Sequence, residues 1–185
     1  MQRALIVPVE DLSAEAFAPF GWILGKPFPS DPTACAYSHP GSDFWHEHIF
    51  IPGNGGETEV LWVNYRNKTL QLNALEVHWL TQQAIVPLGG EILHVVCPGV
   101  DGSRLPDLSR LKAFRIGDKQ GICMAPGCWH ASFVLEGQVT CLMLTRRSTT
   151  VDLVNHLIHG CQAEETSVVE LGTLFDGQIL LSPEK

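Results

Sequence analysis

Short apolar runs, most of them separated by glycine- or proline-containing turns, follow one another through most of this chain. They span four to nine residues each, which suits β-strands better than helices. Two of the turns between them, Pro87–Gly90 and Glu136-Gly137, are predicted to close β-hairpins. Many short strands at regular spacing predict a sandwich or a barrel. The predicted strands are Val60–Tyr65, Leu70–His78, Gln83–Val86, Glu91–Val96, Leu111–Ile116, Gly121–Met124, Ala131–Leu135 and Val139–Leu144.

Two segments depart from the strand pattern and predict short helices. Residues 12–24 begin with Ser13 as an N-cap, and Pro19 and Gly21 should end that helix early. Residues Val151–His159 are predicted to be helical because their apolar side chains share one face. Residues 162–185 return to short extended pieces.

The composition describes a chain with ample material for a core and little affinity for polyanions. Of its 185 residues, 45% are hydrophobic and 17% are charged, and the formal net charge is −8 without any run of Lys or Arg. Such a chain repels phosphate backbones, so nucleic acid is not an expected partner. No apolar run approaches the roughly 20 residues that a membrane helix needs, so no membrane partner is expected either.

The six cysteines include no C-x-x-C pair, and several lie in or beside apolar runs. Buried reduced thiols are therefore preferred over a disulfide framework. The opening apolar stretch, Ala4–Val9, is short and is followed by two acidic residues, which is unlike a signal peptide. Reduced thiols without a leader predict a cytoplasmic protein. The cysteines are Cys35, Cys97, Cys123, Cys128, Cys141 and Cys161.

Glu76 and His78 are the first candidate site residues, because they lie two positions apart on a predicted strand. Side chains at that spacing share one face, so a carboxylate and an imidazole would reach one ion inside a barrel. Gln83 begins the next strand, and His130 opens another after the Pro126-Gly127 turn. These nitrogen and oxygen ligands suit nickel, manganese, iron or zinc rather than a thiolate site.

Each of these residues also has a purely structural interpretation. A strand histidine is often a hydrogen-bonded core residue, Gln83 could act through hydrogen bonds without a metal, and Glu76 could face solvent. The metal could therefore be absent. The joint spacing of all four residues favours a shared site.

Two patterns in the chain resemble the motifs of the cupin superfamily, in which His, Glu and a later His bind a metal inside a β-barrel. The first is Glu76-x-His78-x4-Gln83-x6-Gly90, and the second is Gly127-x-x-His130. Over about residues 57–147, together with an opening segment, the chain resembles the ureidoglycolate lyase family. The segments that carry this resemblance are Ala16–Gly21, Leu75–Pro87, Pro106–Ser109, Leu111–Phe114 and Trp129-His130.

The resemblance implies a mostly β fold, namely a cupin-type antiparallel β-barrel (a double-stranded β-helix or jelly roll) with a few short helices. We expect one cupin-like domain over residues 1–160. Residues 161–185 are expected to form a C-terminal extension that packs on the barrel or on a partner subunit. The resemblance further implies a homodimer that acts on a small-molecule carboxylate.

The family reaction splits ureidoglycolate into glyoxylate and urea, so a lyase of purine and allantoin nitrogen catabolism is the expected function. Members usually carry Tyr-His where this chain has Met124-Ala125, Asp-Arg where it has Thr145-Arg146, and a histidine at Ala131. These departures leave two alternatives open. One is another cupin enzyme, such as a metal-dependent isomerase or dioxygenase acting on a small polar carboxylate, and the other is a non-catalytic barrel that binds a small acid.

Catalytic roles are predicted for His130, Glu76 and Arg66. Metal binding is predicted for Glu76, His78, Gln83 and His130, with one divalent ion as the expected cofactor if a metal is present.

Substrate binding is predicted for Arg66, Arg146, Trp129, Gln83 and His46. The two arginines are candidates for holding a carboxylate, because a guanidinium grips that group through two parallel hydrogen bonds. Salt bridges at the barrel rim are the alternative for both. Trp129 could instead be a plain core residue, and His46 could lie in a surface loop.

Overall fold

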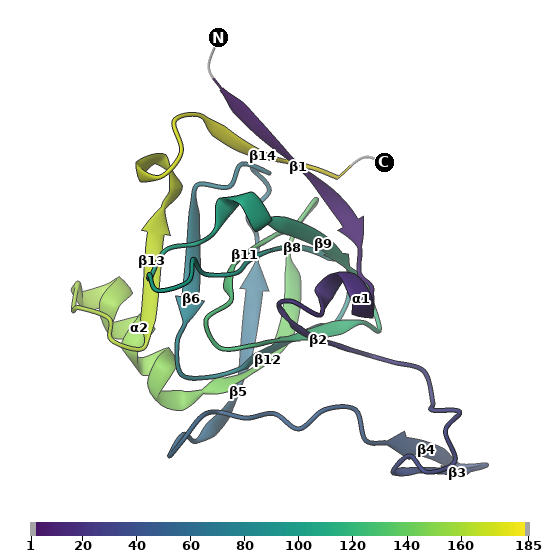
Figure 1. Ribbon diagram of the computed structural model, residues 1–185. Coiled ribbons are helices and arrows are strands. Elements are labelled where there is room, and N and C mark those ends of the chain that lie inside the picture. The colour runs from purple at the N-terminus through teal and green to yellow at the C-terminus, as the bar shows by residue number, and fades with distance from the viewer. Residues whose placement is uncertain (1–2, 184–185) are drawn as a thin grey trace.

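A computed structural model describes residues 3–183 of the chain. It contains two curved sheets, one of seven strands and one of five, and a two-stranded hairpin that projects away from them (Figure 1). The strands are β1 Ala4–Asp11, β2 Gly21–Leu24, β3 Ala36–His39, β4 Ser42–Trp45, β5 Thr58–Tyr65, β6 Ala74–His78, β7 Gln83–Pro87, β8 Ile92–Cys97, β9 Lys112–Ile116, β10 Gly121–Met124, β11 Trp129–Phe133, β12 Val139–Arg146, β13 Thr166–Glu170 and β14 Gln178–Ser182.

Eight consecutive strands, β5 to β12, have the connectivity of a jelly roll. The smaller sheet contains four of them in the order β5-β12-β7-β10, and the larger sheet contains the other four in the order β6-β11-β8-β9. The chain therefore crosses from one sheet to the other at most connections, and the pairings among these strands are antiparallel. This topology confirms the predicted mostly β, cupin-type antiparallel barrel.

Both predicted hairpins are wrong. The turn at Pro87–Gly90 joins β7 to β8, and the turn at Glu136-Gly137 joins β11 to β12, but in each case the two strands belong to different sheets. Gly90 and Gly137 do have positive φ values, 91° and 56°, so each permits a tight change of direction. Local turn chemistry does not determine which sheet the next strand joins.

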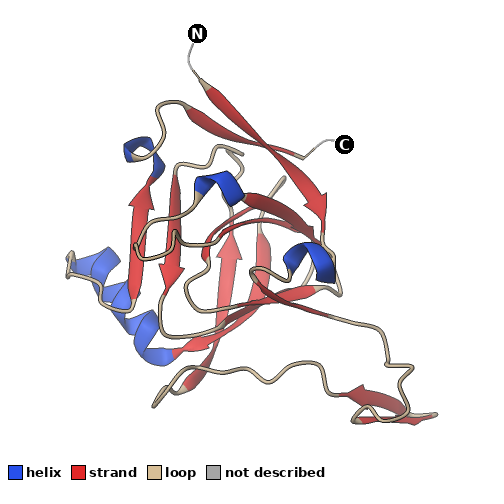
Figure 2. Ribbon diagram, in the orientation of Figure 1, coloured by secondary structure: helices blue, strands red, loops and turns tan. Residues whose placement is uncertain are grey.

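The helices are few and lie at the edges of the sheets (Figure 2). Helix α1, Ala14–Phe17, is capped by Ser13, whose side chain accepts a hydrogen bond from the Ala16 N–H at 3.2 Å. Helix α2, Arg147–His159, ends at Gly160 in the left-handed conformation. Both predicted helices are confirmed, although α2 begins earlier than expected. Two single 3-10 turns, η1 Leu108–Arg110 and η2 Leu171–Thr173, complete the set.

The inward faces of the two sheets enclose one hydrophobic core. Ile92 and Val96 on β8 and Phe114 on β9 point into it. Phe17 of α1 packs edge-on against Phe114 with 5.5 Å between ring centroids. Alternate positions on the same strands face the other way.

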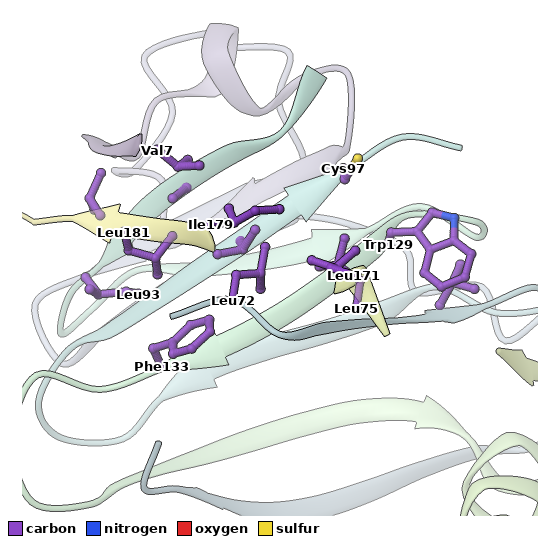
Figure 3. Packing of buried hydrophobic residues seen from close by; sticks show 14 residues of the cluster. Val7, Leu72, Leu75, Leu93, Cys97, Trp129, Phe133, Leu171, Ile179 and Leu181 are labelled. Carbon is purple, nitrogen blue, oxygen red and sulfur yellow. The ribbon is translucent and has the colours of Figure 1, made fainter. Parts of the chain in front are cut away.

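A second core lies on the outward face of the larger sheet (Figure 3). Leu75, Leu93 and Phe133 come from β6, β8 and β11, and the terminal strands cover them with Val7 of β1 and Ile179 of β14. None of these side chains is more than 4% exposed. The extension beyond residue 160 also contributes two strands, because β13 pairs with β6 and β14 pairs in parallel with β1.

The six cysteines are all free thiols, and four of them are buried, as predicted. Within residues 3–183, no helix has the length and apolar character that crossing a membrane requires.

Residues 26–57, called the arm below, leave the barrel after β2 and return to it at β5 (Figure 1). Strands β3 and β4 form a hairpin at its far end. Near the barrel, the ring of His48 on the arm lies against Trp22 at a tilt of 30°, with 4.6 Å between ring centroids. Several large apolar side chains of the arm, including Phe44 and Ile49, are exposed.

Candidate active site

Two neighbouring strands of the larger sheet bring three of the four predicted metal ligands together. Strands β6 and β11 pair so that Glu76 lies directly opposite His130. Because side chains alternate along a strand, Glu76 and His78 face the barrel interior while Leu75 and Val77 belong to the outer core. The expectation from the sequence that Glu76 and His78 share one face of the strand is therefore correct.

Glu76, His78 and His130 form a compact cluster of donor atoms. One ligand atom from each of the three lies within 4.8 Å of the others. Glu76 Oε1 is 3.2 Å from His130 Nε2, and the rings of His78 and His130 have centroids 5.3 Å apart. Both histidines are buried, whereas the Glu76 side chain is 37% exposed.

Hydrogen bonds on the far side of each ring leave the inward nitrogens available. His130 Nδ1 lies 3.0 Å from the Cys128 carbonyl, which can only accept, so Nδ1 carries a proton and Nε2 faces the Glu76 carboxylate. His78 Nδ1 bonds the Thr166 hydroxyl of β13 at 3.1 Å. His130 Nε2 is buried and makes no hydrogen bond. A lone pair 3.2 Å from the Glu76 carboxylate is unfavourable unless a proton or a metal cation lies between the two atoms.

A cavity of about 180 Å³ opens beside this cluster. Two further polar atoms in it, Gln83 Oε1 and Thr145 Oγ1, are buried without a hydrogen-bond partner. Buried polar atoms are rarely left unpaired, so their position indicates a ligand site. The lining residues are Leu61, Val63, Tyr65, Glu76, His78, Gln83, Met143, Thr145, Thr149, Thr150 and Leu153.

Burial and neighbouring charges set the protonation of the cluster. Burial lowers the pKa of His78 to about 4 and lowers the pKa of nearby His94 well below its ordinary value. Burial alone would raise the pKa of Glu76, but the neighbouring His130, with Nε2 3.2 Å from the carboxylate, outweighs this and lowers it. At neutral pH the site therefore holds a neutral His78 imidazole beside an ionised Glu76 carboxylate.

This donor set fits a divalent transition metal. Two imidazole nitrogens and a carboxylate oxygen lie close together, and the Gln83 carbonyl oxygen faces the same cavity without a partner. The position of His130 Nε2, buried without a hydrogen-bond partner beside a carboxylate, is the feature that most directly calls for a cation.

The structure does not bring Arg66 into this cavity. It follows Tyr65, which faces inward, so its own side chain points outward by strand alternation. Arg66 is exposed, and its Nε donates a hydrogen bond of 2.6 Å to Gln138 Oε1. Among residues 3–183, no Lys or Arg belongs to the lining of the cavity.

Arg146 is directed away from the cavity for the same reason, because its neighbour Thr145 faces inward. Its guanidinium donates to the carbonyls of Pro52 and Asn54 at the end of the arm, and lies 3.5 Å from the Glu165 carboxylate. Arg146 thus fixes the return of the arm to the barrel.

Trp129 and His46 also lie outside the cavity lining. Trp129 is 1% exposed in the outer core and packs edge-on against Trp79, with centroids 5.8 Å apart. It supports β11 immediately behind His130. His46 is exposed on the arm, where its backbone N–H donates to the Cys35 carbonyl.

Three residues at or beside the site were missed from the sequence: Tyr65, Thr145 and His94. Tyr65 and Thr145 line the cavity from β5 and β12. His94 lies fully buried on β8, with its ring stacked 5.7 Å from that of His130. Alternation along the predicted strands could have placed Tyr65 and His94 on the inward face, whereas Thr145 lies one residue beyond the predicted strand Val139–Leu144.

Proteins described as ureidoglycolate lyases are similar to this chain in sequence. A model of the ureidoglycolate lyase family matches residues 4–164. A ureidoglycolate lyase of Rhodobacter capsulatus is 32% identical over 136 residues, which cover 70% of this chain and 77% of that protein. One of Burkholderia mallei is 30% identical over 146 residues, which cover 75% of this chain and 81% of that protein.

Among solved structures, the chain is similar to a dTDP-6-deoxy-D-glucose-3,5-epimerase of Legionella pneumophila. That similarity has a TM-score of 0.44 and 15% sequence identity, over 81% of this chain and 80% of the other. The family model, by contrast, spans every strand that carries the cavity, from β5 to β12. The chain therefore belongs to the ureidoglycolate lyase family.

Proposed function

We propose that the protein is a lyase that splits ureidoglycolate into glyoxylate and urea. The observation that carries the proposal is the convergence of Glu76, His78 and His130 on one cavity, in a chain whose relatives are named ureidoglycolate lyases. The cavity is small, and several polar side chains are among its lining residues, which suits a compact polar acid.

The reaction sets three tasks for the protein. Ureidoglycolate carries a hydroxyl, a carboxylate and a ureido nitrogen on one carbon. The hydroxyl loses its proton and becomes the aldehyde oxygen, the C–N bond breaks, and its electron pair stays on nitrogen, which takes a proton and leaves as urea. The site must therefore accept one proton, return one proton, and hold the carboxylate. General acid–base help of this kind typically contributes about 10²–10⁴-fold.

Glu76 is the proposed proton acceptor. Its pKa is lowered by His130, so it is ionised at neutral pH, and it lies 3.2 Å from His130 Nε2. A proton taken from the substrate hydroxyl can be shared between these two atoms and then returned to the ureido nitrogen. The Cys128 carbonyl holds the His130 ring in the orientation that this sharing needs.

Thr145 and the first turn of α2 are the proposed seat of the substrate carboxylate. Thr145 is 3% exposed and its hydroxyl has no partner. Thr149 and Thr150, at the start of α2, line the same cavity. The N-terminal end of a helix favours an anion through its free N–H groups and its dipole. This seat takes the place of the clamp expected from Arg66 and Arg146.

A divalent metal ion is the proposed cofactor, held by Glu76, His78 and His130, with Gln83 Oε1 as a further candidate ligand. Bound there, the ion would supply the Lewis acidity that lowers the pKa of a substrate hydroxyl. Ligands of these types suit nickel, manganese, iron or zinc.

Urea release from ureidoglycolate by the purified protein tests the function. We expect Glu76→Gln and His130→Gln each to lower kcat/KM by about 10²-fold or more. Glu170→Gln makes the same chemical change at an exposed position of β13 and should keep full activity. Full turnover by the His130 variant would overturn the assignment.

Elemental analysis of the same preparations tests the metal. We expect bound metal in the unaltered protein and its loss in the Glu76→Ala/His78→Ala double variant. A stoichiometric metal without urea release would favour a different metal-dependent cupin reaction. Absence of both would favour a barrel that only binds a small acid.

We further propose a homodimer located in the cytoplasm. The outer face of the five-stranded sheet presents Val60, Trp62, Val86, Leu142 and Leu144 without a charged side chain among them, and this set is called the apolar face below. A second copy of the chain is the occupant that this face and the exposed apolar side chains of the arm would suit. The reduced thiols support the cytoplasmic location, and the net charge of −8 favours a small-molecule partner over nucleic acid.

A further inference from the structure

Strand β13, in the C-terminal extension, contacts one of the proposed metal ligands. It pairs with β6 so that Thr166 lies directly opposite His78, and side chains at opposite positions share one face of a sheet. The Thr166 hydroxyl lies 3.1 Å from His78 Nδ1, and both residues are buried. Because β13 lies beyond residues 4–164, this support for His78 comes from outside the part of the chain that matches the family model.

The contact determines which atom of His78 remains for an ion. A hydroxyl can both donate and accept, so Thr166 can bond Nδ1 whichever ring nitrogen carries a proton. With Nδ1 engaged on the β13 side, Nε2 is the nitrogen left for the cluster with Glu76 and His130. The same bond restrains rotation of the ring, which sets where Nε2 points.

Asp152 of α2 holds the start of β13 in this place. Its carboxylate accepts hydrogen bonds from three consecutive backbone N–H groups, at 3.0, 3.0 and 3.1 Å. These groups belong to Glu164, Glu165 and Thr166. The Glu165 carboxylate in turn accepts a hydrogen bond of 2.6 Å from the hydroxyl of Thr149, which lines the cavity. Helix α2 therefore fixes the position of the Thr166 hydroxyl together with the pairing to β6.

We propose that Thr166 is a positioning residue for His78, whose imidazole it holds so that Nε2 is directed at a divalent metal ion. This inference deepens the proposed function and rests on the metal site assigned there. A ring that is already held loses little freedom when the ion binds, whereas a ring without this partner would have to be ordered at that moment. The C-terminal extension therefore contributes to the site through His78, although it supplies no ligand itself.

Zinc binding to the metal-free protein tests the proposal. Zinc suits ligands of these types, and its affinity is measured by competition with a chromogenic chelator at a temperature well below the melting transition. The Glu76→Ala/His78→Ala double variant measures zinc bound elsewhere, for example at the exposed thiols of Cys35 and Cys161. The difference between the two proteins is the zinc that the site holds.

Thr166→Val removes the hydroxyl and keeps the size and shape of the side chain. We expect it to weaken zinc binding at the site by about 10–100-fold, as the loss of a hydrogen bond to a metal-binding histidine does. Thr166→Ser, which keeps the hydroxyl, should retain the affinity of the unaltered protein.

Thr140→Val is the matched control. It removes from β12 a hydroxyl that bonds Asn64 Oδ1 at 2.7 Å, and Thr140 does not belong to the lining of the cavity. This variant should keep full zinc affinity. A merely structural role of Thr166 would lower the melting temperature of Thr166→Val and leave the zinc affinity of the folded protein unchanged.

The outcomes separate this inference from the proposed function. Unchanged zinc affinity in Thr166→Val, or in Thr166→Ala if the valine variant does not fold, would overturn the inference even if the protein releases urea. An unaltered protein that binds no more zinc than the double variant would overturn it as well. Zinc affinity that depends on the Thr166 hydroxyl, in a protein that does not cleave ureidoglycolate, would uphold the positioning role and reject the lyase.

Discussion

Burial keeps several side chains in and around the barrel interior in their uncharged forms. Cys97 is a clear case outside the site. Its thiol is fully buried and bonds the Asp107 carbonyl at 3.0 Å. Burial raises the pKa of this thiol from 9.0 to about 12.

The raised pKa of Cys97 predicts a loss of stability at alkaline pH. As the pH rises through 9.0, the thiol loses its proton in the unfolded chain but keeps it in the folded protein. The stability that the buried thiol contributes is therefore fully present below pH 9.0. It is lost progressively between that pH and the folded pKa of about 12. At pH 10 one such thiol costs about 1 kcal/mol of unfolding free energy. Urea unfolding at pH 8 and pH 10 measures this, and Cys97→Ala should lose that part of the pH dependence. Cys161→Ala, at an exposed thiol, serves as the control. Identical pH dependence in Cys97→Ala and the unaltered protein would contradict the argument.

Individual site residues could be predicted where strand parity alone decides their orientation. Glu76 and His78 share the inward face because Leu75 and Val77 supply the apolar outer face. The same parity places Arg66 outward once Tyr65 faces in, yet the chemistry of guanidinium alone had suggested a carboxylate clamp. Residue type predicts what a side chain can bind, whereas register determines whether it reaches the ligand.

At the scale of elements, the barrel strands β5 to β12 followed from the sequence, whereas β1, β2 and the strand pairing did not. The positions of β5, β7 and β9 agree with the apolar runs, because each run is short and ends at a turn. The start of β6 was misplaced because Leu70 adopts a positive φ of 52°, which interrupts the regular strand. The two wrong hairpins arose because a jelly roll sends successive strands to opposite sheets, where they pair with strands remote in the sequence.

The C-terminal strands are predicted to be essential for folding, although they lie far from the cavity in sequence. Ile179 on β14 is 2% exposed in the outer core that also backs β6 and β11. Ile179→Ala should lower the unfolding free energy by about 2–4 kcal/mol, as large-to-small changes in cores do. Leu157→Ala removes a similar side chain at a position that is 69% exposed on α2 and should change stability little. Chemical denaturation of both variants measures the difference, and equal midpoints would show that the terminal strands are dispensable.

Although the chain has a net charge of −8, parts of its surface are strongly apolar. On the apolar face, Trp62 is 67% exposed and Val60 is 60% exposed, and on the arm Phe44 and Ile49 are 62% and 65% exposed. A twofold dimer pairs the same surface on both copies, so one interface would cover both apolar faces at once. A stable interface of this kind buries roughly 800 Å² on each partner.

Trp62→Lys is predicted to dissociate the proposed dimer while leaving each barrel folded. The Trp62 side chain is exposed on the outer face of β5, which is an edge strand. A lysine at this position would therefore stay solvated in the single chain. In the dimer the same ammonium would be buried without a partner, which is strongly unfavourable. Sedimentation equilibrium should give the mass of two chains for the unaltered protein and of one chain for Trp62→Lys, with the melting transition of the single chain retained. Leu157→Lys adds the same charge at an exposed position of α2 and should remain dimeric.

Two outcomes would contradict this prediction. A Trp62→Lys protein that keeps the mass of two chains would place the interface on another surface. An unaltered protein that is monomeric at all concentrations would reject the dimer, because the apolar face would then be stable in water.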